Sequence, residues 1–362
     1  MSGLFSMPML AFEGISYTAE RNAALLFGIA FVVAIIYLLR HPFWGVRLKS
    51  LGRMPFAMVF LVITLLFITI AWMDGIAWKD TIPEGKQVPL EAKEPRSMLD
   101  RSFAMVVGVP EYEYRARSYS APMATTEFVD KSIEIKHHHL LGTNKTGYDT
   151  LYLILKGIKP AVVIGTLPLV IAIPVALLFG VSAGFFGGRV DDFVVYLYTT
   201  LASIPSLLLL IALISALGPG LLQVAFGLGI AGWIGLCRLV RGESLKLREM
   251  EYVQAATCLG VSRGKIILRH VIPNLLHIVI ITAILAFSGL VLSEAVLAYL
   301  GIGLEYSWGG IIDNARAELA RTPVIWWNFV FSTLAFFLLV LSVNVVGDVL
   351  RDLLDPRTTF ED

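Results

Sequence analysis

Long apolar runs alternate with short polar segments along most of the chain. A helix that crosses about 30 Å of hydrocarbon needs about 20 mostly apolar residues. Seven runs meet this requirement, at residues 23–39, 54–72, 160–185, 193–217, 220–236, 274–298 and 326–346. Segment 186–192 and the tripeptide Gly218-Pro219-Gly220 separate neighbouring runs with residues typical of turns. The pattern predicts an all-α polytopic membrane protein with about seven spans.

The segment between the second and third spans has a different character. It contains repeated Pro and Gly residues, and residues 132–136 alternate in the way that predicts a strand. We interpret it as a small extracytoplasmic insert with little regular structure. The predicted organisation is an extracytoplasmic N-terminus (1–22), two N-terminal spans (23–72) with a basic cytoplasmic loop (40–53), the insert (73–150), core spans (151–347) with a cytoplasmic loop (237–273), and a cytoplasmic tail (348–362).

Composition and charge narrow the class of protein further. Of the 362 residues, 57% are hydrophobic and only 16% are charged, which excludes a soluble single-core protein. The formal net charge of +1 gives no basis for nucleic-acid binding. Lys and Arg of the short loops concentrate in segments 40–53, 186–192, 237–273 and the tail. By the positive-inside rule these segments are cytoplasmic, so the N-terminus is predicted outside and the C-terminus inside.

The long cytoplasmic loop has the pattern of two short helices joined at a glycine. Met250, Val253 and Leu259 are the apolar positions of the first helix, and Gly260 follows where a helix end favours a left-handed residue. Ser262 is placed to cap the second helix. This surface suits docking of another protein, although a helix lying on lipid headgroups fits the composition equally well.

The same loop resembles a known motif. Residues 251–260, Glu-Tyr-Val-Gln-Ala-Ala-Thr-Cys-Leu-Gly, continuing to Pro273, are similar to the EAA loop of ABC importer permeases. Further segments agree in order with the C-type subunits of the dipeptide/oligopeptide/nickel permease family, namely His139–Thr143 with Gly147 and Asp149, Ala183–Gly188 with Asp191, Ile204–Leu208, Leu217–Gly220, Ser293–Ala295, Tyr299–Gly303, Ser307–Gly309 and Gly347–Arg357. The resemblance covers about residues 137–357.

Some positions depart from the family pattern. Gln254 stands where the family has the glutamate of its EAA motif, Asn144 replaces an aspartate, and Tyr148 replaces an arginine. The 23–39 helix is an addition to the usual six-span core, and residues 73–136 have no counterpart that can be aligned.

The resemblance implies the transmembrane fold of type I ABC importers in a prokaryotic cytoplasmic (inner) membrane. It implies a heterodimer with a second permease subunit, two cytoplasmic ATPase subunits that bind ATP and Mg, and an extracytoplasmic substrate-binding protein. The residues expected to receive the ATPase motion are Glu251, Gln254, Ala255, Ala256, Gly260 and Pro273. The chain has no GxxxxGK[ST] motif, so we expect no ATPase activity and no cofactor or metal of its own. The cargo stays open among dipeptides, longer peptides, nickel chelates and oligosaccharides.

Rival functions depend on isolated residues. A stand-alone ion-coupled secondary transporter needs several ionisable residues within the membrane, and only Glu294 clearly qualifies, either in the pathway or at the outer interface. Gly180-Val181-Ser182-Ala183-Gly184 matches the GxSxG pattern of hydrolases, but it lies in an apolar helical run, where small residues four apart favour close packing. His137–His139 lacks the acidic or thiol neighbours that would complete a metal site.

Overall fold

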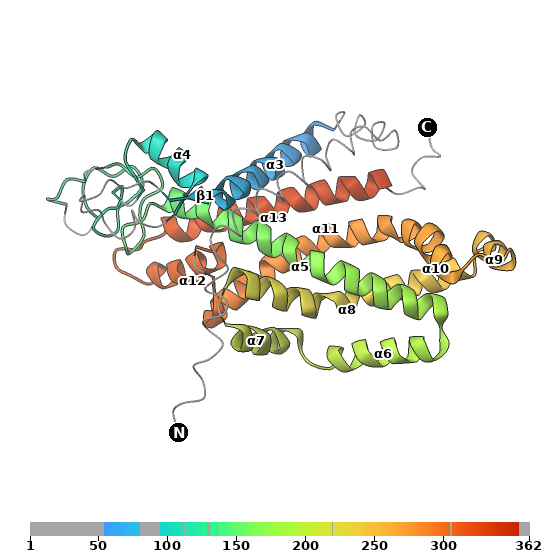
Figure 1. The fold of residues 1–362 in the computed structure, drawn as a ribbon. Coiled ribbons are helices and arrows are strands. Elements are labelled where there is room, and N and C mark those ends of the chain that lie inside the picture. The colour runs from blue at the N-terminus through green and yellow to red at the C-terminus, as the bar shows by residue number, and fades with distance from the viewer. Residues whose placement is uncertain are drawn as a thin grey trace, which may run out of the picture. The chain divides into compact units, whose positions relative to one another are not determined.

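The computed structural model describes residues 54–79, 95–111, 113–128, 131–135, 137–218, 220–304 and 306–354. The predicted first span, the 40–53 loop, the N-terminus and most of the tail lie outside these residues. Figure 1 shows a mostly helical chain. Its elements are α3 (Pro55–Gly75), β1 (Ala77–Trp78), β2 (Arg96–Ser97), α4 (Met98–Val107), α5 (Thr150–Phe186), α6 (Gly188–Ala202), α7 (Ser206–Leu217), α8 (Leu221–Arg248), α9 (Glu251–Cys258), α10 (Arg263–Ile266), η3 (Ile267–Val271), α11 (Ile272–Leu297), η4 (Ala298–Ile302), α12 (Trp308–Leu319) and α13 (Trp327–Leu354).

The chain forms two compact units. Unit 1 contains residues up to Val162 together with Gly303–Ser342, and unit 2 contains Val163–Ile302 together with Val343–Asp362. Helices α5 and α13 contribute to both.

The apolar runs form long helices. Within the described residues, α3, α5, α8, the continuous helix Arg263–Ile302 and α13 are long and apolar enough to cross a membrane, and α6 with α7 makes a sixth candidate. The sequence predicted one span over 193–217, but α6 and α7 meet at a bend of 83°. Pro205 causes the break, because it has no N–H and disfavours a helical residue before it.

A second difference concerns the predicted cytoplasmic loop. Helix α8 does not end at residue 236 but continues to Arg248. Residues 237–248 are rich in Leu, Arg, Lys and Glu, which favour helix, and no proline interrupts them. The loop is therefore shorter than predicted, and its short helices are carried directly on the end of a long one.

Close packing of α5 against α8 organises the core of unit 2. A Cβ atom at Gly180 would lie 2.8 Å from the Cys237 carbonyl oxygen, and one at Gly184 would lie 2.6 Å from that of Arg241. Only glycine allows the backbones to approach this closely. The GxSxG pattern therefore serves helix packing, as predicted, and lacks the strand–turn–helix of a hydrolase elbow.

The outer insert has more regular structure than predicted. Helix α4 begins at a capping box, in which Ser97 Oγ accepts from the Asp100 N–H and Asp100 Oδ2 accepts from the Ser97 N–H. Strands β1 and β2 pair antiparallel beside it. The strand predicted over 132–136 is reduced to an isolated bridge between Thr126 and Glu134.

Buried charges join the insert to the helices of unit 1. Lys156 Nζ of α5 lies 2.6 Å from Asp74 Oδ1 of α3 and 2.8 Å from Asp100 Oδ1 of α4. Burial alone raises the pKa of Asp100, but the Lys156 ammonium and the bonds from Ser97 outweigh it, so this pKa lies below its ordinary value. Its contribution to stability is present at neutral pH and is lost only as the pH falls below about 4.

This cluster generates a stability prediction. Lys156→Met leaves two buried carboxylates without their cation, and removing one partner of a buried ion pair costs about 3–5 kcal/mol. We expect the detergent-solubilised protein to melt several degrees lower than the wild type in a tryptophan-fluorescence melt.

Two further variants serve as controls. Lys131→Met changes an exposed lysine outside the cluster and should leave the melting temperature unchanged. The triple variant that adds Asp74→Asn and Asp100→Asn removes the uncompensated charge and should recover part of the loss. Equal melting of Lys156→Met and Lys131→Met would show that the cluster contributes no stability.

Candidate functional site

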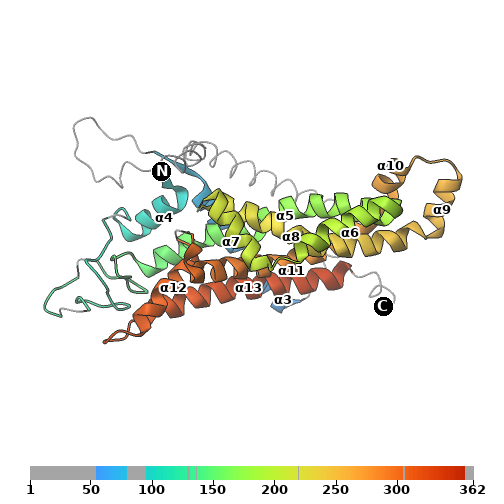
Figure 2. The same ribbon diagram turned by 90° about the horizontal axis from the view of Figure 1, so that it is seen from below.

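The segment that resembles the EAA loop lies at one end of unit 2. Figures 1 and 2 show α9 and α10 at the tip of this unit, beyond the ends of α8 and α11. The segment Glu249–Ser262 is called the coupling segment below. It is attached to the unit at both ends by long helices, so any force on it acts directly on them.

Few side chains anchor the coupling segment. Val253 is only 1% exposed and packs into the core of unit 2, with Ala256 partly buried beside it. Ile266 of α10 is also buried in this core. Tyr252 accepts a bond of 3.3 Å from Asn274 Nδ2. The remainder of α9 stands away from the unit.

Gly260 turns the chain between the two short helices. Its φ of +78° lies in the left-handed region, as the sequence predicted. The Val261 N–H donates to Ala256 O at 3.1 Å and closes the end of α9. A Cβ at Gly260 would meet no atom within 4 Å, so the backbone conformation rather than space requires glycine. Ser262 occupies the predicted N-cap position, but its side chain makes no capping bond.

The apolar side chains of α9 differ from the prediction. Only Val253 is buried, whereas Leu259 is 83% exposed and Met250 and Tyr252 are half-exposed. The sequence pattern placed Leu259 on the packed face. Leu259 is the C-cap residue of α9 and follows the last helical residue, Cys258, so it lies beyond the packed face of the helix.

The other predicted coupling residues have distinct surroundings. Glu251, Gln254 and Ala255 are exposed, and Gln254 Nε2 donates to the Glu249 carbonyl oxygen at 3.2 Å. Pro273 was predicted at the entry to a separate span. Instead, α10, η3 and α11 run on as one helix, and the π-helical turn η3 directly precedes Pro273. A wider turn there accommodates a residue that donates no N–H.

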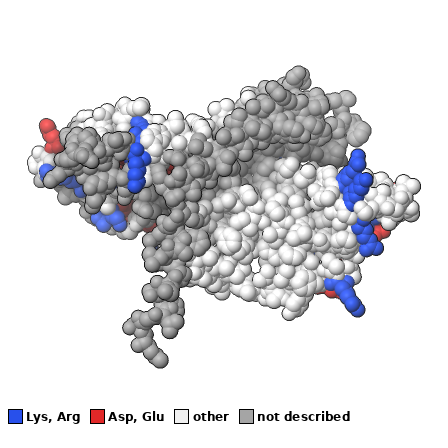
Figure 3. All heavy atoms as spheres, viewed as in Figure 1, with Lys and Arg blue, Asp and Glu red and all other residues white. Residues whose placement is uncertain are grey.

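Basic residues surround the coupling segment. Figure 3 shows Lys and Arg atoms at the end of unit 2 that carries α9 and α10, while the visible flank of the unit is uncharged. Arg241 of α8 binds Asp191 of α6 through two bonds, Nε to Oδ1 at 2.5 Å and Nη2 to Oδ2 at 2.7 Å. This pair joins the helix that carries the coupling segment to the first turn of α6. Sequence reasoning missed it, because the partners are fifty residues apart.

Glu294 lies within α11 and is buried, with 6% of its surface exposed. It therefore does not extend to the outer interface, which was one of the two interpretations of this residue.

Among the described residues, no group of three or more His, Cys, Asp or Glu is placed to hold a metal ion. His139 instead binds the Asp149 carboxylate at 2.9 Å.

The motif around His139 is a compact turn that starts α5. Asp149 Oδ1 caps the helix by accepting from the Tyr152 N–H at 3.0 Å. Asn144 Oδ1 accepts from the backbone N–H groups of Thr146 and Tyr148. An amide oxygen accepts these bonds as a carboxylate would, which explains why asparagine can replace the family's aspartate here.

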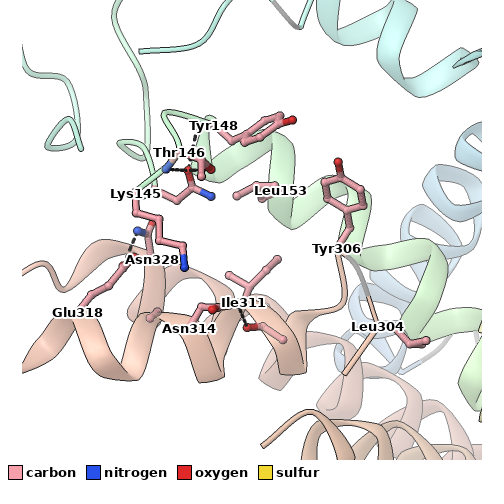
Figure 4. Close-up of a pocket in the computed structure, with 13 residues that line it drawn as sticks. Lys145, Thr146, Tyr148, Leu153, Leu304, Tyr306, Ile311, Asn314, Glu318 and Asn328 are labelled. Atoms are coloured by element: carbon pink, nitrogen blue, oxygen red, sulfur yellow. Dashed lines mark hydrogen bonds between the residues drawn. The ribbon is translucent and has the colours of Figure 1, made fainter. Parts of the chain in front are cut away.

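Unit 1 contains a pocket of 290 Å³ beside this turn. Figure 4 shows Lys145, Asn328 and Glu318 on one side of it and Tyr306 and Leu304 on the other. Its further lining residues are Asn144, Thr146, Tyr148, Leu153, Gly310, Ile311, Asn314 and Ala315.

The carboxylate of the pocket is fixed by hydrogen bonds. Glu318 Oε2 accepts from Asn328 Nδ2 at 2.8 Å, and Oε1 accepts from the Tyr119 hydroxyl at 3.0 Å. Burial and this carboxylate raise the pKa of Tyr119 to about 12, so the hydroxyl remains a donor. Helix α12, which supplies Glu318, was not predicted, although its cap is visible in the sequence as Ser307, whose Oγ accepts from the Gly310 N–H.

Comparison with known proteins places these features in a family. Residues 176–360 match the model of the binding-protein-dependent transport system inner membrane component, which is more than half of the chain. The chain is 33% identical over 223 residues to the oligopeptide transport system permease protein OppC of Haemophilus influenzae, covering 61% of this chain and 71% of that protein. It is 34% identical over 222 residues to the probable D,D-dipeptide transport system permease protein DdpC of Escherichia coli, covering 60% of this chain and 74% of that protein.

A solved structure of the MetNI methionine ABC transporter, in an inward-facing conformation, aligns with a TM-score of 0.45 at 20% identity, over 56% of this chain and 97% of that chain.

The family match bears on several predictions. The predicted fold class, an all-α polytopic membrane protein, is confirmed by the family match and by the apolar helices. The multi-pass inner-membrane location is confirmed as well, and the relatives are permease proteins. The chain belongs to the family of inner membrane components of binding-protein-dependent transport systems, and it is a permease subunit of an ATP-driven importer.

Proposed function

We propose that this permease subunit imports peptides, and that separate cytoplasmic ATPase subunits drive it through the coupling segment. The observation that carries the coupling role is the geometry of α9. This helix stands at the tip of unit 2, is anchored mainly by Val253, and leaves Leu259 83% exposed. An exposed leucine among charged residues is expected where a partner protein covers it. The names of the relatives support the peptide cargo.

The proposed assembly follows from the family. A second, different permease subunit completes the pathway, two ATPase subunits bind ATP and Mg, and a binding protein delivers the cargo outside. The chain itself performs no ATP hydrolysis. The Lys and Arg of the 186–192 and 237–273 segments support a cytoplasmic position for the coupling segment, with the N-terminus outside and the C-terminus inside.

We propose that motion passes from the coupling segment to the spans by rigid transmission. Helix α8 enters the segment directly, and Gly180 and Gly184 hold α8 against α5. The Arg241–Asp191 pair holds α8 to α6. Packed helices move as bodies between discrete arrangements, so closure of the ATPases would tilt these three spans together.

The pocket of unit 1 supports a docking role on the outer side. Its mouth carries exposed Lys145 and Asn314, and Glu318 is fixed at its base. Such a polar recess with preset hydrogen-bonding groups suits a side chain of the binding protein. The insert beside it is proposed to shape the same docking surface.

The hinge of the coupling segment provides a test of this function. Gly260→Val places a branched side chain at φ +78°, which costs about 1–2 kcal/mol and displaces Leu259. In the assembled complex in proteoliposomes, we expect ATP-driven uptake of a labelled tripeptide to fall at least tenfold, and ATPase activity to lose its stimulation by the binding protein.

Gly264→Val is the matched control. Gly264 lies in α10, outside the left-handed region, and a Cβ there meets no atom within 4 Å. We expect near-normal uptake. If Gly260→Val takes up tripeptide and is stimulated by the binding protein as the wild type is, the segment does not transmit the ATPase motion. If the wild-type ATPase is stimulated but no tripeptide is taken up, the proposed peptide cargo is wrong while the role of the segment stands.

The Arg241–Asp191 pair yields a second prediction. Hydrogen bonds between charged groups contribute about 1.5–3 kcal/mol each. Arg241→Ala should therefore loosen α6 from α8, and we expect tripeptide uptake per ATP hydrolysed to fall about tenfold while the complex still assembles.

A charge exchange separates this effect from general damage. The double variant Arg241→Asp with Asp191→Arg restores the pair in reverse and should recover part of the uptake. If Arg241→Ala transports as the wild type does, the pair has no part in transmission.

A further inference from the structure

One face of α6 carries polar side chains along a helix that enters the membrane. Asp192, Tyr196, Thr199 and Ser203 follow one another at spacings of four, three and four residues, which places them on one line of a helix. All four are exposed, and Tyr196 is 69% exposed. These residues are called the polar stripe.

The other side of α6 has the opposite character. Val194 is 2% exposed and Tyr198 is 8% exposed, and both belong to the core cluster of unit 2. The helix is therefore packed by its apolar side and presents its polar side outward. An exposed apolar line that includes Phe193 runs beside the polar stripe. The polar stripe suits contact with water, and the apolar line suits contact with lipid or protein.

The stripe is long enough to reach the middle of a membrane. Ser203 is eleven residues after Asp192, and a helix rises about 1.5 Å per residue, so the two lie about 16 Å apart along the helix. This is about half of the 30 Å hydrocarbon thickness. A carboxylate or a phenol is costly on a lipid-facing surface, whereas the Ser203 hydroxyl is already satisfied by the Thr200 carbonyl oxygen at 2.7 Å.

The helix break lies at the same depth. Helix α6 ends at Ala202, α7 starts at Ser206, and the two diverge by 83°. No side chain caps the start of α7. Irregular backbone at membrane depth occurs where it is buried in protein or lines a water-filled cavity, and residues 202–208 are exposed on this chain.

Helix α3, another candidate span, offers a comparison. Its exposed line carries Val59, Val62, Leu66 and Thr69, of which only Thr69 is polar, and the Thr69 hydroxyl donates to the Leu65 carbonyl oxygen at 2.8 Å. The contrast indicates that α3 and α6 expose their surfaces to different surroundings.

We infer that the polar stripe and the α6–α7 break line the aqueous path of the solute. This inference rests on the proposed function, because it needs a pathway on this side of unit 2. Hydroxyl groups that both donate and accept suit a solute with several amide groups, such as a short peptide. Asp192 adds a carboxylate that attracts a cationic terminus where the solute leaves the membrane-embedded part.

Thiol accessibility tests the inference in the assembled complex. Cys258→Ser removes the exposed native thiol, and Cys237 is buried. Thr199→Cys and Ser203→Cys are then introduced singly, with Val62→Cys as the lipid-facing control. A charged methanethiosulfonate needs water and a thiolate to react. We expect it to modify positions 199 and 203 at least ten times faster than position 62, at a rate that changes when vanadate and ATP trap the ATPases.

Two results would overturn the inference. If N-ethylmaleimide modifies these positions but the charged reagent is as slow as at position 62, the stripe faces lipid. If neither reagent reacts in the complex, a second permease subunit covers the stripe. Should one variant fail to assemble, Asp192→Cys offers a third position on the same line. The thiol-modification rates do not depend on which solute is transported. The inference about the polar stripe can therefore be wrong while peptide import is right, and it can be right if the solute is not a peptide.

Discussion

In hydrocarbon, a backbone N–H or C=O group that lacks a partner costs several kcal/mol, and this constraint governs the structure. It explains why nearly every apolar run forms a long helix. It also gives meaning to two of the places where the helical pattern changes within unit 2, both of which contain a proline. The π-helical turn η3 precedes Pro273, where one donor is missing, and the α6–α7 break contains Pro205, where another is missing. The first is absorbed within a continuous helix, whereas the second opens the chain by 83°.

The difference between these two prolines follows from their neighbours. Pro273 follows the π-helical turn η3, and the helix from Arg263 to Ile302 continues through it. At the other break, Ser203 Oγ donates to Thr200 O at 2.7 Å and satisfies the end of α6, but nothing comparable starts α7. Helix α5 also continues through Pro160, Pro168 and Pro174, so a proline bends or ends a helix of this chain according to its surroundings.

The sequence allowed the position of most spans to be predicted, because about 20 apolar residues in succession are a local property. Gly260 and the small residues of α5 were predictable for the same reason, since a left-handed turn and a close helix contact each need a particular residue type. Lys156 shows where this reasoning ends. The predicted span began at residue 160, whereas α5 begins at Thr150, where Asp149 caps it, and its charged Lys156 is compensated by Asp74 and Asp100 from distant parts of the chain.

The candidate site was predictable to a similar extent. The motif located α9, but Leu259 is the C-cap residue, where helical periodicity no longer predicts which side chain is packed. The Arg241–Asp191 pair depends on the antiparallel packing of α6 beside α8 and is visible only in three dimensions. Asp191 and Asp192 are adjacent but point to different surroundings, one into this pair and the other along the polar stripe. The first turn of α6 thus lies between the helix that carries the coupling segment and the face proposed to meet the solute. A displacement of α8 by less than a helical turn would move that face directly, without any change in the fold of α6.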